Sequence, residues 1–251
     1  MRSAAAPAGP DRMTRVLIHV EGQTEETFVN QVLAPHLYDR GYTKVSARLL
    51  GNARQRDHRG GIRPWPVVRG DIVRHLREDR DGLATTMIDY YALPQTGAGP
   101  WPGRAEASAL PSGAAATQRA ATVEAALAAD LGHAMGSGFD PARFVPFVVM
   151  HEFEGLLFSD CEAFGRGIGR PDLGPRFEAI RTGFATPEDI NDSPTTAPSK
   201  RVEHLVRGYQ KPLLGTLAAL TIGIDAIRRA CPHFEQWLER LDRWSGRTRP
   251  P

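Results

Sequence analysis

A run of six residues that ends abruptly in a carboxylate constrains this chain more than any other feature. Residues 15–20 read Arg-Val-Leu-Ile-His-Val, and Glu21, Gly22 and a helix start capped by Thr24 follow at once. An apolar, β-branched run that leads directly into a helix is typical of a buried strand in a parallel sheet. Ligand sites of open α/β sheets lie at the carboxyl ends of such strands. We therefore expect Glu21 at a site where a cation or a basic partner offsets its desolvation.

The rest of the chain continues this alternation of strands and helices. Further strands are predicted at residues 45–50, 84–88 and 144–150, and helices at 24–40, 67–80 and 117–131. This order predicts an α/β fold, with a parallel-rich sheet of about four strands and helices on both faces. Beyond Leu156, segments separated by Gly and Pro predict a helical C-terminal region. We expect a disordered tail (1–13), an α/β core (14–160) and a helical region packed on that core (161–251).

Composition excludes several classes of protein. The 251 residues are 41% hydrophobic, which supports a real core, and the net charge of +2 rules out a general polycation. Cys161 and Cys231 match no metal-binding spacing and indicate a reducing, cytoplasmic setting. No apolar run reaches the roughly 18–20 residues that cross a bilayer, and the N-terminus lacks the apolar core of a signal peptide. We therefore expect no membrane partner.

Three of the predicted strands end in acidic residues. Glu21 follows the first strand, Asp89 the third, and the pair Glu152 and Glu154 the fourth. In a parallel sheet these ends share one edge, and clustered carboxylates repel unless a cation compensates them. Hard oxygen ligands favour Mg²⁺ or Mn²⁺ over zinc. A single acid at a strand end more often caps a helix or forms a salt bridge. The prediction of a metal site therefore rests on the acids of all three strand ends meeting at one edge of the sheet.

The segment His151-Glu152-Phe153-Glu154 invites comparison with zinc motifs but does not match one. Position 155 is glycine, so no second histidine lies one turn further on. If the strand continues, Glu152 and Glu154 share one face; if a helix begins at Glu152, they diverge and one of them alone can be a ligand. His151 is favoured as a supporting or core histidine.

Basic residues gather in two segments outside the strands. Ser199 can cap a helix whose first turn carries Lys200 and Arg201, and cations there oppose the helix dipole unless an anion lies nearby. A loop predicted at residues 51–66 carries four arginines that suit a nucleic-acid backbone, namely Arg54, Arg56, Arg59 and Arg63. An ordinary solvated helix start and a mobile loop are the alternatives. Four aromatic residues suit either base stacking or core packing: Trp65, Tyr90, Tyr91 and Trp101.

Five motifs in order resemble the bacterial domain-of-unknown-function family 4276. They cover nearly the whole chain from about Thr14. The motifs read Val20-Glu21-Gly22-Gln23-Thr24-Glu25, Asp89-Tyr90-Tyr91-Ala92-Leu93-Pro94, His151-Glu152-Phe153-Glu154-Gly155-Leu156-Leu157-Phe158-Ser159-Asp160, Ile190-Asn191-Asp192-Ser193-Pro194-Thr195-Thr196-Ala197-Pro198-Ser199-Lys200-Arg201 and Cys231-Pro232-His233-Phe234-Glu235-Gln236-Trp237-Leu238.

That family is similar to TOPRIM domains, the metal-binding fold of topoisomerases, primases and OLD-type nucleases. The resemblance implies a TOPRIM-like fold in which Glu21 and the first Asp of an Asp-x-Asp, here Asp89, serve Mg²⁺. Tyr91 stands where the second Asp is expected, so Glu152 or Glu154 has to replace that ligand. The resemblance also implies a gene neighbourhood of ABC-type ATPases in antiphage defence loci, and hence an ATPase partner.

These observations favour a Mg²⁺- or Mn²⁺-dependent nuclease acting on DNA or RNA. Glu21, Asp89 and Glu152 are its expected metal ligands, and Glu154 is a second-site ligand or base. Lys200 is expected to stabilise charge on the phosphoryl group and Arg201 to orient the backbone. A non-catalytic adaptor that docks on an ATPase, which Tyr91 favours, and a phosphohydrolase of small phosphate esters are the alternatives. The nucleic acid type, the trigger and any homo-oligomeric state stay open.

Overall fold

The computed structural model describes residues 13–50, 62–191 and 196–248, and its centre is a parallel sheet. The strand order is β2-β1-β3-β4, and the short β5 also pairs with β3. All of these pairings are parallel, which confirms the predicted fold class. The strands are β1 (Arg15–Val20), β2 (Lys44–Leu49), β3 (Gly82–Asp89), β4 (Phe144–Val145) and β5 (Val148–Val149).

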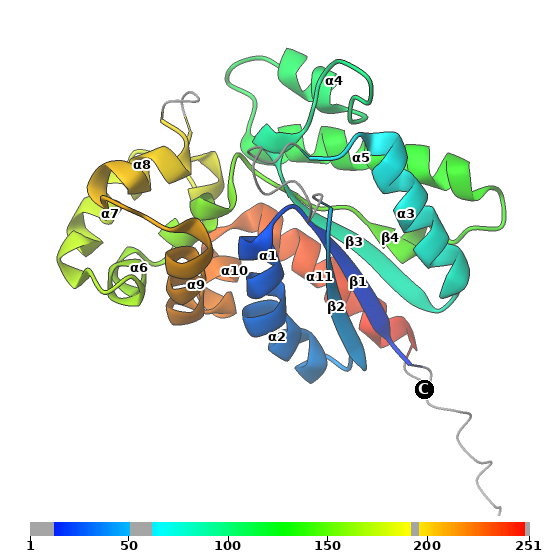
Figure 1. Ribbon diagram of the computed structural model, residues 1–251, viewed down its shortest axis with the longest axis horizontal. Helices are drawn as coiled ribbons and strands as arrows, with labels where there is room; N and C mark the ends of the chain where they lie inside the picture. Colours follow the sequence, from blue (N-terminus) through cyan, green and yellow to red (C-terminus); the bar gives the residue numbers. More distant parts are fainter. Residues whose placement is uncertain (1–12, 51–61, 192–195, 249–251) are drawn as a thin grey trace, which may run out of the picture.

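Helices cover both faces of this sheet (Figure 1). One face packs against a helical segment that follows β1 and against the last helix of the chain; the other face packs against helices that flank β3. The first segment comprises α1 (Gln23–Phe28), a π-helical turn (Val29–Leu33) and α2 (Ala34–Asp39). The second group comprises α3 (Trp65–Glu78), α4 (Arg104–Ala109) and α5 (Ala116–Met135).

The remainder of the described chain is helical, as predicted. Figure 1 shows α6 to α9 as a lobe beside α1, with α11 lying along the sheet. These elements are a 3₁₀ segment (Phe153–Ser159), α6 (Cys161–Gly167), α7 (Gly174–Arg181), α8 (Pro198–Leu205), a π-helical turn (Lys211–Gly215), α9 (Thr216–Ile222), α10 (Ile224–Ala230) and α11 (Pro232–Thr248). No helix in the described ranges combines the length and the apolar character needed to cross a bilayer.

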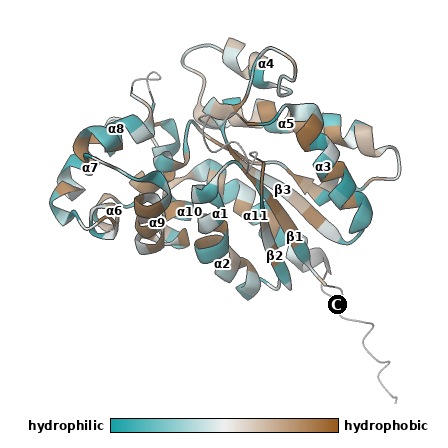
Figure 2. Cartoon of the chain, viewed as in Figure 1, coloured by the Kyte–Doolittle hydropathy of each residue, from teal (hydrophilic) through white to brown (hydrophobic). Residues whose placement is uncertain are grey.

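The central strand β3 is buried along its whole length, and the sheet is hydrophobic on both faces (Figure 2). The strand predicted at residues 144–150 is interrupted, and it forms β4 and β5 instead. Pro146 lies at the break, and proline has no N–H to donate to a ladder. Thr86 fills the gap, because its Oγ1 accepts from the Phe147 N–H at 2.9 Å.

Helix α11 is attached to the sheet by polar contacts as well as by packing. Trp237 donates from Nε1 to the Thr85 hydroxyl of β3 at 2.9 Å. The hydroxyl of Tyr42 donates to the Leu241 carbonyl at 2.8 Å. At the start of α11, the buried Glu188 carboxylate accepts from the N–H groups of His233 and Phe234, each at 2.9 Å. The last helix therefore completes the core around the first strands.

Candidate functional site

The carboxylates of Glu21 and Asp89 meet at the carboxyl ends of neighbouring strands. β1 and β3 pair in parallel with Val20 opposite Met87, so the residues that follow them leave the sheet at the same edge. The Asp89 N–H donates to Glu21 Oε2 at 3.3 Å. The predicted convergence of these two acids is therefore present in the fold.

Burial makes these two carboxylates unusual acids. Removal from solvent, reinforced by the charge of Glu25, raises the pKa of Glu21 to about 7. Burial and the charges of Glu21 and Glu25 raise the pKa of Asp89 well above its ordinary value. The Oδ1 atom of Asp89 is buried and has no hydrogen-bond partner in the described part of the chain. Mutual repulsion and desolvation thus make the charged forms of both carboxylates unfavourable, and Lys211 offsets this only in part.

Glu25 belongs to the same group, although the sequence marked it merely as a favourable helix-start residue. Helix α1 begins at Gln23 with Gly22 as its N-cap, so the expected cap at Thr24 is wrong. Glu25 Oε2 accepts from the Gly22 N–H at 3.0 Å and closes the first turn. Its side chain is buried, and burial raises its pKa. The helix start therefore adds a third carboxylate beside Glu21.

Glu152 and Glu154 diverge, because a 3₁₀ segment begins at Phe153, directly after Glu152. Glu152 Oε2 accepts from the backbone N–H of Ser199 at 2.9 Å, in the first turn of α8. Glu154 is fully buried and forms an ion pair with Lys211, with 2.9 Å between Oε2 and Nζ. Both carboxylates still act on the strand-end acids, since Glu152 raises the pKa of Glu21 and Glu154 raises that of Asp89.

Lys211 supplies a positive charge to this acidic group, and no local pattern in the sequence predicts this role. It opens the π-helical turn that packs against α1. Burial opposes its charge, but Glu154, Asp89 and Glu152 together raise its pKa above the ordinary value. The lysine therefore stays charged and partly neutralises the five carboxylates, which are Glu21, Glu25, Asp89, Glu152 and Glu154.

The basic residues predicted for the site lie elsewhere or outside the described ranges. Lys200 pairs with Glu203 at 2.7 Å on the surface, and Lys200 and Arg201 line a separate cavity between α7 and α8. Arg201 donates from Nε to the Thr196 carbonyl. The cap predicted at Ser199 is also wrong: Ala197 is the N-cap of α8, and the anion near this helix start is Glu152.

The arginine loop is described at one end alone. Arg63 forms an ion pair with Asp71 at 2.8 Å, and its carbonyl accepts from Trp101 Nε1 at 3.2 Å. Trp65 and Trp101 pack together in the core with ring centroids 5.0 Å apart, as the packing alternative predicted. The predicted backbone contacts Arg54, Arg56 and Arg59 lie outside the described residues.

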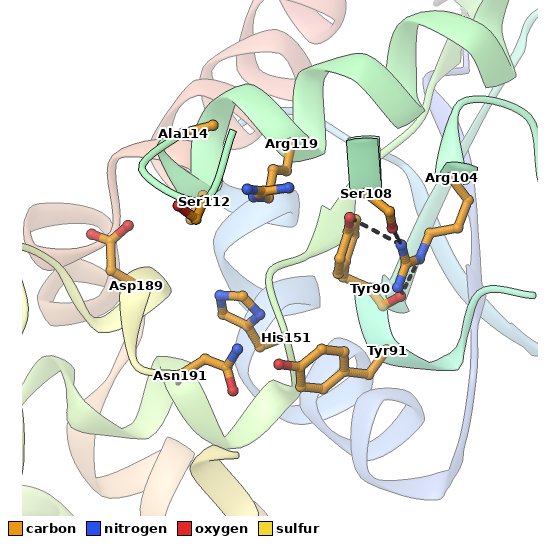
Figure 3. A pocket seen from close by; sticks show the side chains of 11 residues that line it. Tyr90, Tyr91, Arg104, Ser108, Ser112, Ala114, Arg119, His151, Asp189 and Asn191 are labelled. Atoms are coloured by element: carbon orange, nitrogen blue, oxygen red, sulfur yellow. Dashed lines mark hydrogen bonds between the residues drawn. The ribbon is translucent and has the colours of Figure 1, made fainter. Parts of the chain in front are cut away.

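A cavity of about 500 Å³ is lined by residues that follow Asp89 and precede Glu152 in the chain (Figure 3). Tyr90 and Tyr91, which follow Asp89, form one wall with Arg104, and His151 projects into the space between them and Arg119. His151 is the one non-glycine residue with positive φ in the described ranges, at 63°. Burial lowers its pKa to about 4, so the ring is neutral at physiological pH. It supports the site rather than joining the carboxylates.

The comparisons place these motifs in one family. A family model described as a domain of unknown function, DUF4276, matches residues 20–242. The chain belongs to this family. Searches among curated proteins and among solved structures found no significant match. The DUF4276 match therefore includes every carboxylate of the site and Lys211, and it names no activity.

The donor chemistry of the DUF4276 site suits a hard divalent cation, with one qualification from its geometry. Asp89 Oδ1 is buried without a hydrogen bond to any residue that the structure describes, and carboxylate oxygens are the ligands that Mg²⁺ and Mn²⁺ prefer. Yet within the described ranges no three Asp, Glu, His or Cys side chains form a ready coordination group. Glu152 is directed to Ser199, and the ammonium of Lys211 supplies the positive charge.

Proposed function

We propose that this DUF4276 protein is a Mg²⁺- or Mn²⁺-dependent nuclease that hydrolyses phosphodiester bonds of DNA or RNA. The observation that carries the proposal is the partly buried contact of the Glu21 carboxylate with the Asp89 N–H at the ends of β1 and β3. Two carboxylates with raised pKa values at such a sheet edge destabilise the fold, which indicates a role beyond stability. The resemblance to TOPRIM domains gives the same two residues a metal-binding role.

Glu21 and Asp89 would hold the cation, and Glu152 would complete the set after release from the Ser199 N–H. When bound, such an ion supplies an activated water and polarises the phosphoryl group. Lys211 holds a positive charge beside these acids and suits an approaching phosphodiester anion better than the surface Lys200. Glu154 keeps Lys211 in place through their ion pair and is the candidate base.

A cleavage assay with matched variants tests the proposal. The wild-type chain is incubated with single-stranded and double-stranded DNA and with RNA, in Mg²⁺, Mn²⁺ or EDTA. Glu21→Gln and Asp89→Asn each keep the side-chain shape and should abolish metal-dependent cleavage. Glu162→Gln, whose side chain is 85% exposed on α6, is the control and should cut like wild type. If Glu21→Gln and Asp89→Asn cut as fast as the control, the assignment fails. Cleavage of a mononucleotide ester but not of oligonucleotides would instead identify a phosphohydrolase.

The Glu154–Lys211 ion pair favours one rival, a non-catalytic adaptor that docks on an ATPase. In that case Lys211 is the permanent counter-ion of the cluster, and no divalent cation is needed. Calorimetric titration separates the two functions. Heat from Mn²⁺ binding that disappears in Asp89→Asn supports the nuclease, whereas no binding by a folded wild-type chain supports the adaptor.

A further inference from the structure

The cavity of Figure 3 has the size and chemistry of a ligand site. Its volume of about 500 Å³ exceeds that of a phosphate ion and lies within the roughly 300–1,000 Å³ typical of small-molecule sites. Figure 3 shows His151 between Arg119 and Tyr91, with Arg104 packed on Tyr90 and Asn191 on the wall beside Tyr91. The carboxylates alone do not explain why such a pocket is present.

The charge of the pocket wall is positive. Arg104 is buried with its guanidinium 3.8 Å from the centre of the Tyr90 ring, and it donates to the Tyr90 carbonyl and hydroxyl. Arg119 donates to the carbonyls of Ala107, Leu110 and Pro111. These bonds orient both guanidinium groups with oxygens that carry no net charge. Among the residues that the structure describes, the wall thus holds two cations and one carboxylate, that of Asp189.

Unused hydrogen-bonding groups face the same space. The three bonds of Arg119 engage three of the five N–H donors of a guanidinium, so two remain in the described part of the chain. His151 Nδ1 is buried and has no hydrogen-bond partner there. A buried polar atom without a partner is costly, which points to a group that is bound during function.

The pocket and the carboxylates share the same two strand ends. Tyr90 and Tyr91 follow Asp89 directly, and His151 precedes Glu152. The positive φ of His151 turns the chain between the two sites. Strained conformations of this kind persist where the surrounding structure enforces them, and they cluster at ligand sites. A molecule in the pocket would therefore contact residues that directly follow Asp89 and directly precede Glu152 in the chain.

We propose that this pocket binds one nucleotide unit, with its phosphate at Arg119 and its base against Tyr91. The anion matches the net positive wall and the unused guanidinium donors. The Tyr91 ring, which lies tilted over His151 at 5.3 Å between centroids, offers a partly exposed aromatic face for the base. The inference rests on the proposed nuclease function and gives it a substrate subsite, in which the terminal or flipped nucleotide of the strand is held.

Calorimetry in EDTA tests the subsite without the metal-dependent reaction. The probes are deoxyadenosine monophosphate, deoxyadenosine and inorganic phosphate. The monophosphate should bind at least about tenfold more tightly than either fragment, because only it engages both the arginine and the ring. Equal binding of the monophosphate and inorganic phosphate would overturn the nucleotide assignment, and no binding of either would overturn the subsite.

Two substitutions of opposite sign test the location. Asn191→Asp adds a carboxylate to the wall and should weaken monophosphate binding by about tenfold or more. Asp189→Asn removes the wall's carboxylate, keeps an acceptor for Thr186, and should strengthen binding severalfold. Asn30→Asp, an exposed position on the π-helical turn after α1, is the matched control and should leave binding unchanged. If Asn191→Asp and Asn30→Asp weaken monophosphate binding equally, the ligand binds elsewhere. The same conclusion follows if Asp189→Asn leaves binding unchanged.

Comparison with cleavage separates the two proposals. Monophosphate binding by Glu21→Gln together with loss of cleavage supports both. Cleavage by wild type without monophosphate binding overturns the subsite and leaves the nuclease in place. Monophosphate binding by a wild-type chain that cuts no nucleic acid supports the subsite and overturns the nuclease.

Discussion

Replacement of Glu21 by glutamine should stabilise the protein at alkaline pH in the absence of divalent cations. The amide retains an oxygen for the Asp89 N–H and removes the charge that Glu25 and Glu152 oppose. The Glu21 pKa is raised from 4.5 to about 7. At about 1.4 kcal/mol per pKa unit, this corresponds to about 3 kcal/mol of unfavourable free energy at pH 8. That value is an upper limit, because neighbouring carboxylates share the same repulsion.

The sign follows from proton binding. Because the folded-state pKa lies above the unfolded one, the wild-type chain loses stability as pH rises from 4.5 through about 7. Glu21→Gln lacks this loss. We expect a gain of roughly 1–3 kcal/mol at pH 8, or about 3–10 °C in melting temperature for a chain of this size. At pH 5 the wild-type carboxyl is protonated in the folded state, so most of the gain should disappear.

Urea unfolding at pH 5, 6, 7 and 8 in EDTA measures the difference. Glu162→Gln is the control, since its exposed side chain should give no pH-dependent change. Addition of Mg²⁺ or Mn²⁺ should then raise the melting temperature of wild type more than that of Glu21→Gln. A variant no more stable than wild type at pH 8, or equally stabilised at pH 5 and 8, would refute the argument that buried repulsion raises this pKa.

Three further outcomes are expected. Lys211→Met leaves the buried Glu154 without its counter-charge and should destabilise the chain by roughly 1–3 kcal/mol at pH 8, less at pH 5, in the same unfolding assay; equal losses at both values would contradict the ion-pair argument. His19 is fully buried with both ring nitrogens unpartnered in the described chain, and burial lowers its pKa to about 3. This histidine by itself should therefore cost the wild type about 1.4 kcal/mol per pH unit below pH 6.5, and the stability of His19→Leu relative to wild type should rise by that slope as pH falls; a difference that does not change with pH would contradict the assignment. Gly167→Ala places a Cβ 2.7 Å from a backbone atom of α9 and should lower the melting temperature. Gly132→Ala in α5, where the new Cβ meets open space, should instead raise the free energy of unfolding by roughly 0.5–1 kcal/mol. Scanning calorimetry of both variants checks the packing of α6 on α9.

The sheet edge could be predicted because its signals are local. Residues 15–20 and 84–88 are short runs rich in apolar and β-branched residues, and each leads directly into an acid; parallel pairing then requires Glu21 and Asp89 to share one edge. The break at Pro146 can also be predicted from the sequence, since a proline inside a predicted strand removes a ladder hydrogen bond. The apolar pattern of residues 144–150, taken without the proline, predicts one continuous strand instead of β4 and β5.

The counter-charge of the site could not be predicted because its partners are distant in sequence. Lys211 reaches Glu154 by way of a π-helical turn in a segment that resembles an ordinary polar loop. The unfavourable cations at the start of α8 did indicate an anion nearby, but nothing in the sequence identified it as Glu152. Lys200 was favoured because it stands in a conspicuous motif, yet it pairs with Glu203 at the surface.

The attachment of α11 to β3 has a consequence for how the protein is made. Trp237 and Tyr42 join the last helix to elements from the first third of the chain. At about 5–20 residues per second, a ribosome completes β3 roughly 7–29 s before it reaches the start of α11. During that interval the face of the nascent sheet that packs on α1 and α2 lacks the part of its cover that α11 supplies. Biogenesis of the protein should therefore depend on chaperones that shield this face until translation ends.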